Sequence, residues 1–472
     1  MAQPVRALAN QAFSRAAGAP LIEGNHVRLL KDAQENYAAW LEAIDLARRY
    51  VHFESYIIHD DDTGEMFAAT LIAKAGSGVR VRVIYDWLGG FGKTSRGFWN
   101  RLRDGGVEVR CYNPPRLDAP FGWISRDHRK MMVVDGEVGF ATGLCIGHAW
   151  VGNPDKGLDP WRDTGVEVRG PAVAELGQAF ATIWTMLGER IPDDELAADV
   201  PAPCGTMAVR VVATEPATAG MFRLDQLIAA LARERIWLAD AYYAGTTPYV
   251  QALRAAAIHG VDVRLLVPNA TDIPLLRPLS RAGYRPLLEA GVRVFEWNGT
   301  MMHAKTALAD GRWARVGSTN LNVASWLGNC ELDVVVEDET FAREMEDMYL
   351  ADLTNSTEVV LDARRRVHAQ GTTPGVRHRI VPGGRGSGGR AAVRAVRIGN
   401  TIGAAFTNRR PLEPLEARMT AIAGCVLLVL AVLFAVVPGL LAYPLVAVSG
   451  WIGAALLYRG YKLRRGARKR RG

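Results

Sequence analysis

The sequence contains an internal duplication of strand-like and helix-like segments, and this feature limits the possible folds more than any other. Gly-Val-x-Val stretches begin at Gly78 and Gly106 in the first copy and at Gly260 and Gly291 in the second. Strands that alternate with helices are typical of α/β units. One tetrapeptide can recur by coincidence, but the same order of four elements indicates a repeat. The sequence therefore predicts an α/β fold made of two duplicated halves.

Each copy is expected to begin with an apolar strand and to continue through a helix into a second strand. Alternating apolar positions favour the strands, and helical spacing favours the segment between them. The expected segments are strand 50–58, helix 64–75 and strand 78–86 in the first copy, and strand 235–243, helix 249–259 and strand 260–268 in the second.

Changes in composition divide the chain further. An acidic stretch followed by Pro and Ala, around Val200, marks a hinge between the halves. The Arg- and Gly-rich stretch after the second half predicts a flexible linker. The expected divisions are a first half 1–200, a second half 201–361, a basic linker 362–417, a transmembrane helical hairpin 418–458 and a basic cytoplasmic tail 459–472.

The hairpin is expected from two apolar runs. Residues 419–437 carry no charge, Pro438-Gly439 interrupts the run, and 440–458 is almost as apolar. A bilayer core needs roughly 20 apolar residues in a helix. Both flanks are rich in Arg and Lys, so both ends are expected on the cytoplasmic side. The first 20 residues lack an apolar signal region, so we expect the body at the cytoplasmic face of the inner membrane. A hairpin buried in a soluble core is the alternative.

Charge and cysteine content narrow the classes of partner. The net charge is +7, but the segment 362–472 holds 20 Lys or Arg against 3 Asp or Glu, which leaves the body acidic. An acidic body argues against nucleic-acid binding, whereas a basic flank suits anionic lipid head groups.

The five cysteines lack CxxC spacing. This pattern predicts neither a disulfide framework nor a zinc site, and neither a metal nor an obligate protein partner is expected.

Each half also carries the motif His-x-Lys-x-x-x-x-Asp in a matching place. A His and a Lys two residues apart on a strand share one face. A single copy is usually a solvated strand edge, but two copies in matching places of a repeat favour a common site. The candidate residues are His128, Lys130 and Asp135 in the first half and His303, Lys305 and Asp310 in the second.

These residue types suit the cleavage of a phosphodiester. An imidazole can attack phosphorus and leave again as a phospho-histidine, and a second imidazole can protonate the departing alcohol. Two lysines can stabilise the negative charge that builds on the phosphoryl oxygens. Ser318 and Asn320 would add hydrogen-bond donors beside the second motif. The set requires no cofactor.

Both motifs and their surroundings resemble the phospholipase D superfamily, specifically bacterial cardiolipin synthases and their relatives. The resemblance covers roughly Tyr50 to Asp338 and includes "RDHRKMMVVDGEVGFATG", "WRDTGVEVRGPAV" and "GSTNLNVASWLGNCEL". It implies two α/β halves packed face to face about a pseudo-twofold axis, with one shared site. It also implies that one histidine is the nucleophile and that the other acts as acid and then as base. We expect His128 in the first role and His303 in the second.

The resemblance further assigns a carboxylate to each histidine. Glu331 would orient His128, and Asp163 would orient His303, across the boundary between the halves; the alternative for both is a plain surface carboxylate. Asp135 and Asp310 are expected to hold the architecture near Lys130 and Lys305 rather than to touch substrate.

Three features depart from the family pattern. Cys145 stands where many relatives have Asn, Gly165 stands where cardiolipin synthases often have His, and the apolar hairpin is C-terminal rather than N-terminal. A Cys donates hydrogen bonds poorly, so oxyanion support would depend on Ser318 and Asn320. Cys145 is either a small buried residue or a catalytic thiol.

The expected function is that of a membrane-tethered phosphatidyltransferase, which would convert phosphatidylglycerol to cardiolipin and glycerol through a phospho-histidine. The first alternative is a phospholipase D that passes the same intermediate to water and yields phosphatidic acid. A nuclease of the same superfamily and a non-catalytic membrane scaffold are further alternatives. The acidic body argues against the nuclease, and the two intact motifs argue against the scaffold.

Overall fold

Apolar residues on both faces of the central strands build the first half of the fold. β2 (Tyr50–Ser55), β5 (Lys130–Val134) and β6 (Val138–Thr142) are buried along their whole length. Strands buried on both faces belong to sheets that are covered on both sides.

The computed structural model describes residues 2–115, 125–153, 157–192, 200–273, 280–361 and 367–369, together with scattered positions from 428 to 458.

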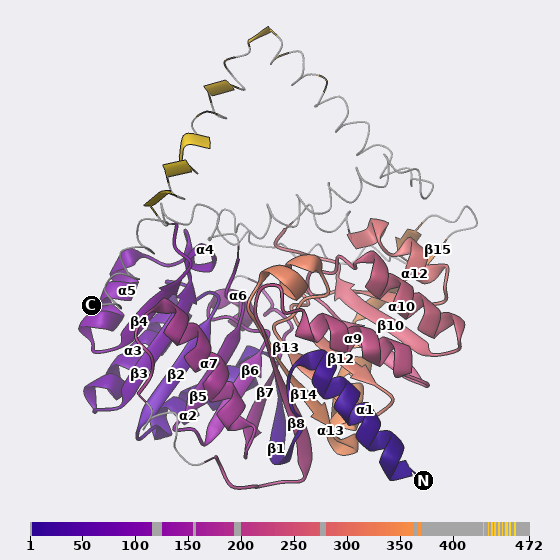
Figure 1. The fold of residues 1–472 in the computed structure, drawn as a ribbon, viewed down its shortest axis with the longest axis horizontal. Coiled ribbons are helices and arrows are strands. Elements are labelled where there is room, and N and C mark those ends of the chain that lie inside the picture. Colours follow the sequence, from indigo (N-terminus) through magenta and orange to yellow (C-terminus); the bar gives the residue numbers. More distant parts are fainter. Residues whose placement is uncertain are drawn as a thin grey trace. The chain divides into compact units, whose positions relative to one another are not determined.

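The first lobe is a mixed sheet, drawn in indigo and purple in Figure 1. Its strands follow the order β4-β3-β2-β5-β6-β7-β1. β2, β3 and β4 are parallel, and the other neighbours are antiparallel. The remaining bounds are β1 (Ile22–Lys31), β3 (Arg80–Asp86), β4 (Glu108–Tyr112) and β7 (Thr164–Arg169).

The second lobe, pink to orange in Figure 1, repeats this order as β11-β10-β9-β12-β13-β14-β8. Its first three strands are again parallel, and β15 and β16 extend that edge. The bounds are β8 (Met207–Thr214), β9 (Arg235–Ala239), β10 (Asp262–Pro268), β11 (Arg293–Trp297), β12 (Thr306–Ala309), β13 (Trp313–Gly317), β14 (Glu331–Glu337), β15 (Ser356–Leu361) and β16 (Val367–Ala369).

The two lobes meet in two ways. β1 pairs with β8 in antiparallel fashion, which makes one continuous sheet of the 16 described strands. β13 and β14 also lie against β6 and β7, so the inner faces of the lobes pack together. Their shared core includes Val166 and Val168 from one lobe and Val316 and Val334 from the other. The duplicated α/β fold with facing halves is therefore as the sequence predicted.

Helices cover both outer faces and fill the interior between the sheets. α2, α3 and α5 pack on the outer face of the first lobe, and α9, α10 and α12 pack on that of the second. α7 and α13 belong to the shared core. The bounds are α1 (Ala2–Ala17), α2 (Asp32–Leu46), α3 (Asp62–Gly76), α5 (Arg96–Asp104), α7 (Val173–Leu187), α9 (Gly220–Leu231), α10 (Thr247–Ile258), α12 (Arg285–Leu288) and α13 (Glu339–Thr354).

The segments expected from the repeat appear with small shifts at their ends. The helix expected over 64–75 is α3, and the helix expected over 249–259 is α10. The strands expected over 50–58 and 235–243 end at Ser55 and Ala239, because the residues that follow leave the sheet as loops. Local pattern alone did not predict β1 and β8, which join the lobes.

The C-terminal expectations cannot be compared in the same way. The linker 362–417 (apart from 367–369), most of the hairpin 418–458 and the tail 459–472 lie outside the described residues. Among the positions that the structure does describe, no helix has both the length and the apolar character needed to cross a membrane. All elements named above belong to one compact unit, residues 1–112 and 126–387, and a second unit comprises 113–125 and 388–472.

Candidate active site

The motif histidines and lysines lie at one end of the central strands, where β2 and β9 end and β5 and β12 begin. Ser55, the last residue of β2, pairs with Lys130, the first residue of β5. In the second lobe, Ala239 at the end of β9 pairs with Thr306, which directly follows Lys305. In a sheet of this type, loops at the carboxyl ends of the parallel strands form the usual binding site.

Each motif histidine is held by a segment of the opposite lobe. The backbone N–H of His128 donates to the carbonyl oxygen of Cys330 at 2.9 Å. The backbone N–H of His303 donates to the carbonyl oxygen of Arg162 at 2.7 Å. Short parallel bridges between Asp127 and Cys330 and between Arg162 and Met302 complete these contacts. Each lobe therefore contributes an equivalent segment that holds the histidine of the other lobe.

The same segments deliver a carboxylate to each imidazole. Glu331, the first residue of β14, places Oε2 2.9 Å from Nδ1 of His128. Asp163, directly before β7, places Oδ2 2.6 Å from Nδ1 of His303. A carboxylate at Nδ1 fixes the tautomer that carries the Nδ1 proton, which leaves the reactive lone pair on Nε2. The cross-lobe pairs predicted from the family resemblance are confirmed.

The lysines contact the histidines of their own motifs. Nζ of Lys130 donates to the carbonyl oxygen of His128 at 2.5 Å. Nζ of Lys305 donates to the carbonyl oxygen of His303 and lies 2.8 Å from Nδ1 and 3.1 Å from Nε2 of its ring. Burial lowers the pKa of Lys305 to about 8, and the positive charge of Lys130 adds to this effect. Lys305 thus stands beside an imidazole, whereas Lys130 is bonded to the backbone of His128.

The electrostatics keep both imidazoles neutral and their carboxylates ionised. Burial, followed by the charge of Lys305, lowers the pKa of His303 to about 3. Burial also lowers the pKa of His128, although Glu331 opposes the change. Burial alone would raise the pKa of Asp163, but His303 and Lys305 outweigh it and lower the pKa to about 2. A neutral imidazole is the form that can act as a nucleophile or base.

Ser318 and Asn320, the donors expected beside the second motif, are both buried. The hydroxyl of Ser318 donates to Oε2 of Glu331 at 2.6 Å, so it serves the carboxylate instead of standing free for substrate. Asn320 is buried, and its Oδ1 has no hydrogen-bond partner among the described residues.

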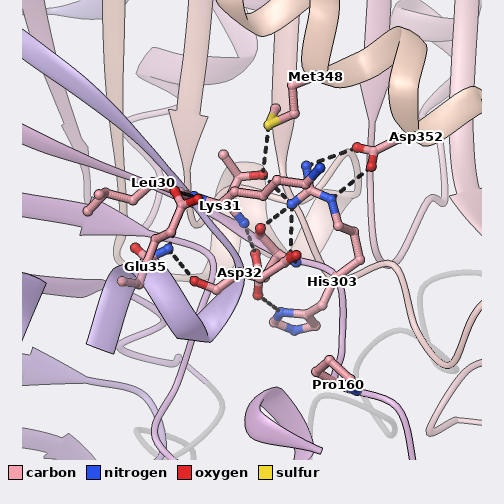
Figure 2. Close-up of polar contacts among 12 residues, drawn as sticks. Leu30, Lys31, Asp32, Glu35, Pro160, His303, Met348 and Asp352 are labelled. Carbon is pink, nitrogen blue, oxygen red and sulfur yellow. Dashed lines mark hydrogen bonds and ion pairs between the residues drawn. The ribbon is translucent and has the colours of Figure 1, made fainter. Parts of the chain in front are cut away.

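Arg162 anchors the segment that carries Asp163 through contacts with both lobes. Figure 2 shows the polar contacts in this region and labels Asp32, His303 and Asp352. Its guanidinium makes two hydrogen bonds of 2.9 Å to the carboxylate of Asp352, from α13 of the other lobe. It also donates to Asp32 at 3.2 Å and to the carbonyl oxygen of Asp163. A buried bidentate pair of this kind gives a fixed geometry. The role of Arg162 cannot be read from the sequence, because its partners are distant in the chain.

Cys145 is buried, and the carbonyl oxygen of this residue accepts a 2.5 Å hydrogen bond from the hydroxyl of Tyr37. Burial raises the pKa of its thiol. A nucleophilic cysteine needs a lowered pKa, so the surroundings favour the small buried role over the catalytic one. Within the residues described, no group of three or more His, Cys, Asp or Glu could hold a metal ion.

The motif aspartates lie at the ends of their strands that are remote from the lysines. Asp135 follows β5 and accepts hydrogen bonds from the backbone N–H groups of Arg48, Arg49 and Tyr50 at 2.7 to 2.8 Å. Asp310 does the same for residues 233–235 at 2.9 to 3.0 Å. The expectation of an architectural role is supported, but neither aspartate is near its lysine or belongs to the reacting group.

Replacing Asp135 with Asn tests this architectural role. The backbone of Asp135 has a φ of 54°, which Asn tolerates, so the change affects mainly the acceptor oxygens. An amide NH₂ in place of one oxygen leaves a backbone donor unpaired, and we expect a loss of about 1–3 kcal/mol of stability. Urea unfolding followed by circular dichroism measures it, and Asp310→Asn should show a similar loss. Unchanged stability in both would remove the architectural role.

Two lobes with one histidine motif each, sharing a site at their common edge, define a protein of the phospholipase D type. The chain belongs to the family described as "Cardiolipin synthase, PLD-like domain", whose model matches residues 40–184 and 225–353. A cardiolipin synthase from Alkalihalophilus pseudofirmus is 34% identical over 72% of this chain and 68% of its own length. Cardiolipin synthase A from Pseudomonas aeruginosa is 35% identical over 76% of this chain and 73% of its own.

A solved structure supports the fold independently. The phosphatidylserine synthase of Haemophilus influenzae covers 74% of this chain and 91% of its own, with a TM-score of 0.59 at 13% identity. At that identity the likeness concerns the fold alone.

Proposed function

We propose that this protein is a phosphatidyltransferase of the cardiolipin synthase type, which converts two molecules of phosphatidylglycerol to cardiolipin and glycerol. The observation that carries the proposal is the pair of imidazoles, His128 and His303, each bonded at Nδ1 to a carboxylate from the opposite lobe. The similarity to curated cardiolipin synthases over most of the chain supports the same substrate class.

The reaction proceeds in two displacements at one phosphorus atom. Nε2 of His128 attacks the phosphorus of the first lipid, a P–N bond forms, and the P–O bond to the glycerol head group breaks. His303 gives a proton to the departing glycerol oxygen. His303 then takes a proton from a hydroxyl of a second phosphatidylglycerol, whose oxygen attacks phosphorus and breaks the P–N bond. Cardiolipin leaves, and His128 is free again.

The charges around the site suit this sequence of steps. His303 must hold a proton in the first displacement, whereas burial and Lys305 lower its pKa in the empty site. The negative charge of an arriving phosphodiester raises the pKa of a neighbouring imidazole. Substrate binding therefore favours the protonated acid. Lys130 and Lys305 stabilise the negative charge of the transition state.

The proposal extends to location. The charge-free run 419–437 and its continuation 440–458 form a helical hairpin in the inner membrane, and the basic residues around it bind anionic head groups on the cytoplasmic side. Such an anchor would hold the body at the surface where both lipid substrates lie.

Incubation of the full chain with anionic vesicles tests both parts of the proposal. The vesicles contain phosphatidylglycerol labelled in the head group, and the products are separated by mass. We expect cardiolipin and free labelled glycerol, with the protein floating with the vesicles in a density gradient. Phosphatidic acid without cardiolipin would identify a hydrolase instead. Cleavage of single-stranded DNA without turnover of any phospholipid would overturn the proposal, and a protein that stays at the bottom of the gradient would refute the anchor.

A further inference from the structure

The two histidine–carboxylate pairs are completed by different residues in the two lobes. Oε2 of Glu331 accepts from Nδ1 of His128 and from the hydroxyl of Ser318, at 2.9 and 2.6 Å. Oδ2 of Asp163 accepts from Nδ1 of His303 at 2.6 Å and from another donor at 3.0 Å, the indole N–H of Trp150. In both pairs, the oxygen that faces the imidazole therefore takes a second hydrogen bond.

Steric fit explains why the first lobe does not use a serine. Gly143 directly follows β6, as Ser318 directly follows β13. A Cβ atom at Gly143 would lie 2.1 Å from Oδ1 of Asp163, well inside contact distance. Any side chain at this position would displace the carboxylate. The second donor to Asp163 must therefore come from elsewhere in the lobe.

Trp150 reaches Asp163 from α6 (His148–Val151), a single helical turn whose first two residues are fixed by hydrogen bonds. The backbone N–H of His148 donates to Asp61 at 2.9 Å, and the carbonyl oxygen of Ala149 accepts from the N–H of Trp161 at 2.9 Å. Trp150 itself is 2% exposed. Its ring stands edge-on to the ring of His303, with centroids 5.5 Å apart and planes at 84°.

We infer that Trp150 is a positioning residue for the reaction, which holds the carboxylate of Asp163 against His303 as the Ser318 hydroxyl holds Glu331 against His128. The inference rests on the proposed function for its effect on turnover. Trp150 acts through Asp163, whose other oxygen accepts from the backbone N–H of Thr164 at 2.9 Å. With both oxygens bound, the carboxylate has one orientation, and the imidazole Nε2 points in one direction.

The indole N–H also weakens the negative charge that the Asp163 carboxylate presents to His303. A donor bonded to Oδ2 takes part of the negative charge of the carboxylate, so its removal strengthens the attraction between Asp163 and an imidazolium. Lys305 and Lys130 also act on His303, and both lower its pKa. Loss of the indole N–H should therefore shift the titration of His303 to higher pH.

Two replacements of Trp150 test the inference. Trp150→Phe removes the donor and part of the ring, and incorporation of benzothienylalanine at 150 exchanges the N–H for sulfur at nearly constant shape. We expect each to lower kcat roughly 10- to 100-fold with little change in KM, the size of one hydrogen bond to a charged group. The limb of the pH–rate profile that reports His303 should move to higher pH in both.

Trp40→Phe is the matched control, because Trp40 is buried in the same lobe and its indole nitrogen has no hydrogen-bond partner among the described residues. We expect its kcat and pH profile to match the unmodified protein. A benzothienylalanine variant with unchanged kcat and an unmoved pH limb would overturn the inference, whatever the stability of Trp150→Phe.

A measurement without substrate separates this inference from the proposed function. In full-length protein labelled with ¹⁵N-histidine, the Nδ1 proton of His303 gives a signal that His303→Ala identifies by its loss. Benzothienylalanine at 150 should shift that signal and leave the signal of His128 in place. An unshifted signal would refute the positioning role, and a shifted signal would support it even if no phospholipid were turned over.

Discussion

Replacement of either motif histidine with alanine should abolish phosphatidyl transfer, with a loss of roughly 10⁴-fold or more for each. The reason is that the two imidazoles perform different halves of one relay, so neither can compensate for the other. His128 and His303 are both held by backbone contacts from the opposite lobe, and removal of an imidazole leaves those contacts intact. Both variants should therefore stay folded and bound to vesicles.

Labelled phosphatidyl groups distinguish the two roles. His303→Ala keeps the nucleophile, so an activated lipid with a good leaving group should leave an acid-labile phospho-histidine on the protein. His128→Ala should form none. His259→Ala, at the exposed end of α10, is the control and should behave as the unmodified protein does. Label on His128→Ala but not on His303→Ala would exchange the roles, and full turnover in either variant would end the proposed mechanism.

Much of the fold follows from local sequence, because the period of apolar residues and the Gly-Val-x-Val turns are local signals. The strand–helix–strand series around β2, α3 and β3 and its copy around β9, α10 and β10 could be predicted in this way. The pairing of β1 with β8 could not. It joins Ile22 to Val209, and no local pattern identifies a partner so far along the chain.

The active site, like the fold, could be predicted from the sequence only in part. The recurrence of His-x-Lys in matching places identified the reacting groups. The expected strand face was wrong, because His128 stands before β5, and His303 and Lys305 stand before β12. The carboxylates followed only from the resemblance to a family, since Asp163 and Glu331 lie in the opposite lobe from the histidines they serve. The roles of Trp150 and Arg162 depend on tertiary packing. Trp150 is needed because Gly143 leaves no room for a side chain beside Asp163, and Arg162 finds its partner on α13. The spacing of residues in the sequence predicts neither of these two roles.

Neutralising the carboxylates should cost nearly as much as removing the imidazoles, and the cost should differ between the lobes. Asp163→Asn and Glu331→Gln keep the shape but lose the charge that fixes the tautomer and stabilises the imidazolium. A comparable change in a serine protease lowers kcat by about 10⁴-fold. We expect losses of this order for Asp163→Asn and about tenfold smaller ones for Glu331→Gln, measured as kcat on phosphatidylglycerol vesicles.

The difference follows from the donors around each group. The oxygens of Asp163 face three N–H donors, from His303, Trp150 and Thr164, and none of the three can accept from an amide NH₂ in the tautomer that the site requires. The oxygens of Glu331 also face three donors, from His128, Ser318 and Asn329. The hydroxyl of Ser318 and the amide of Asn329 can each turn and accept from the new amide instead. Glu175→Gln, an exposed carboxylate on α7, controls for the change in charge. Equal losses in the two variants would mean that neither Ser318 nor Asn329 turns to accept from the amide. Turnover at the unmodified rate in either variant would show that its carboxylate does not orient the imidazole.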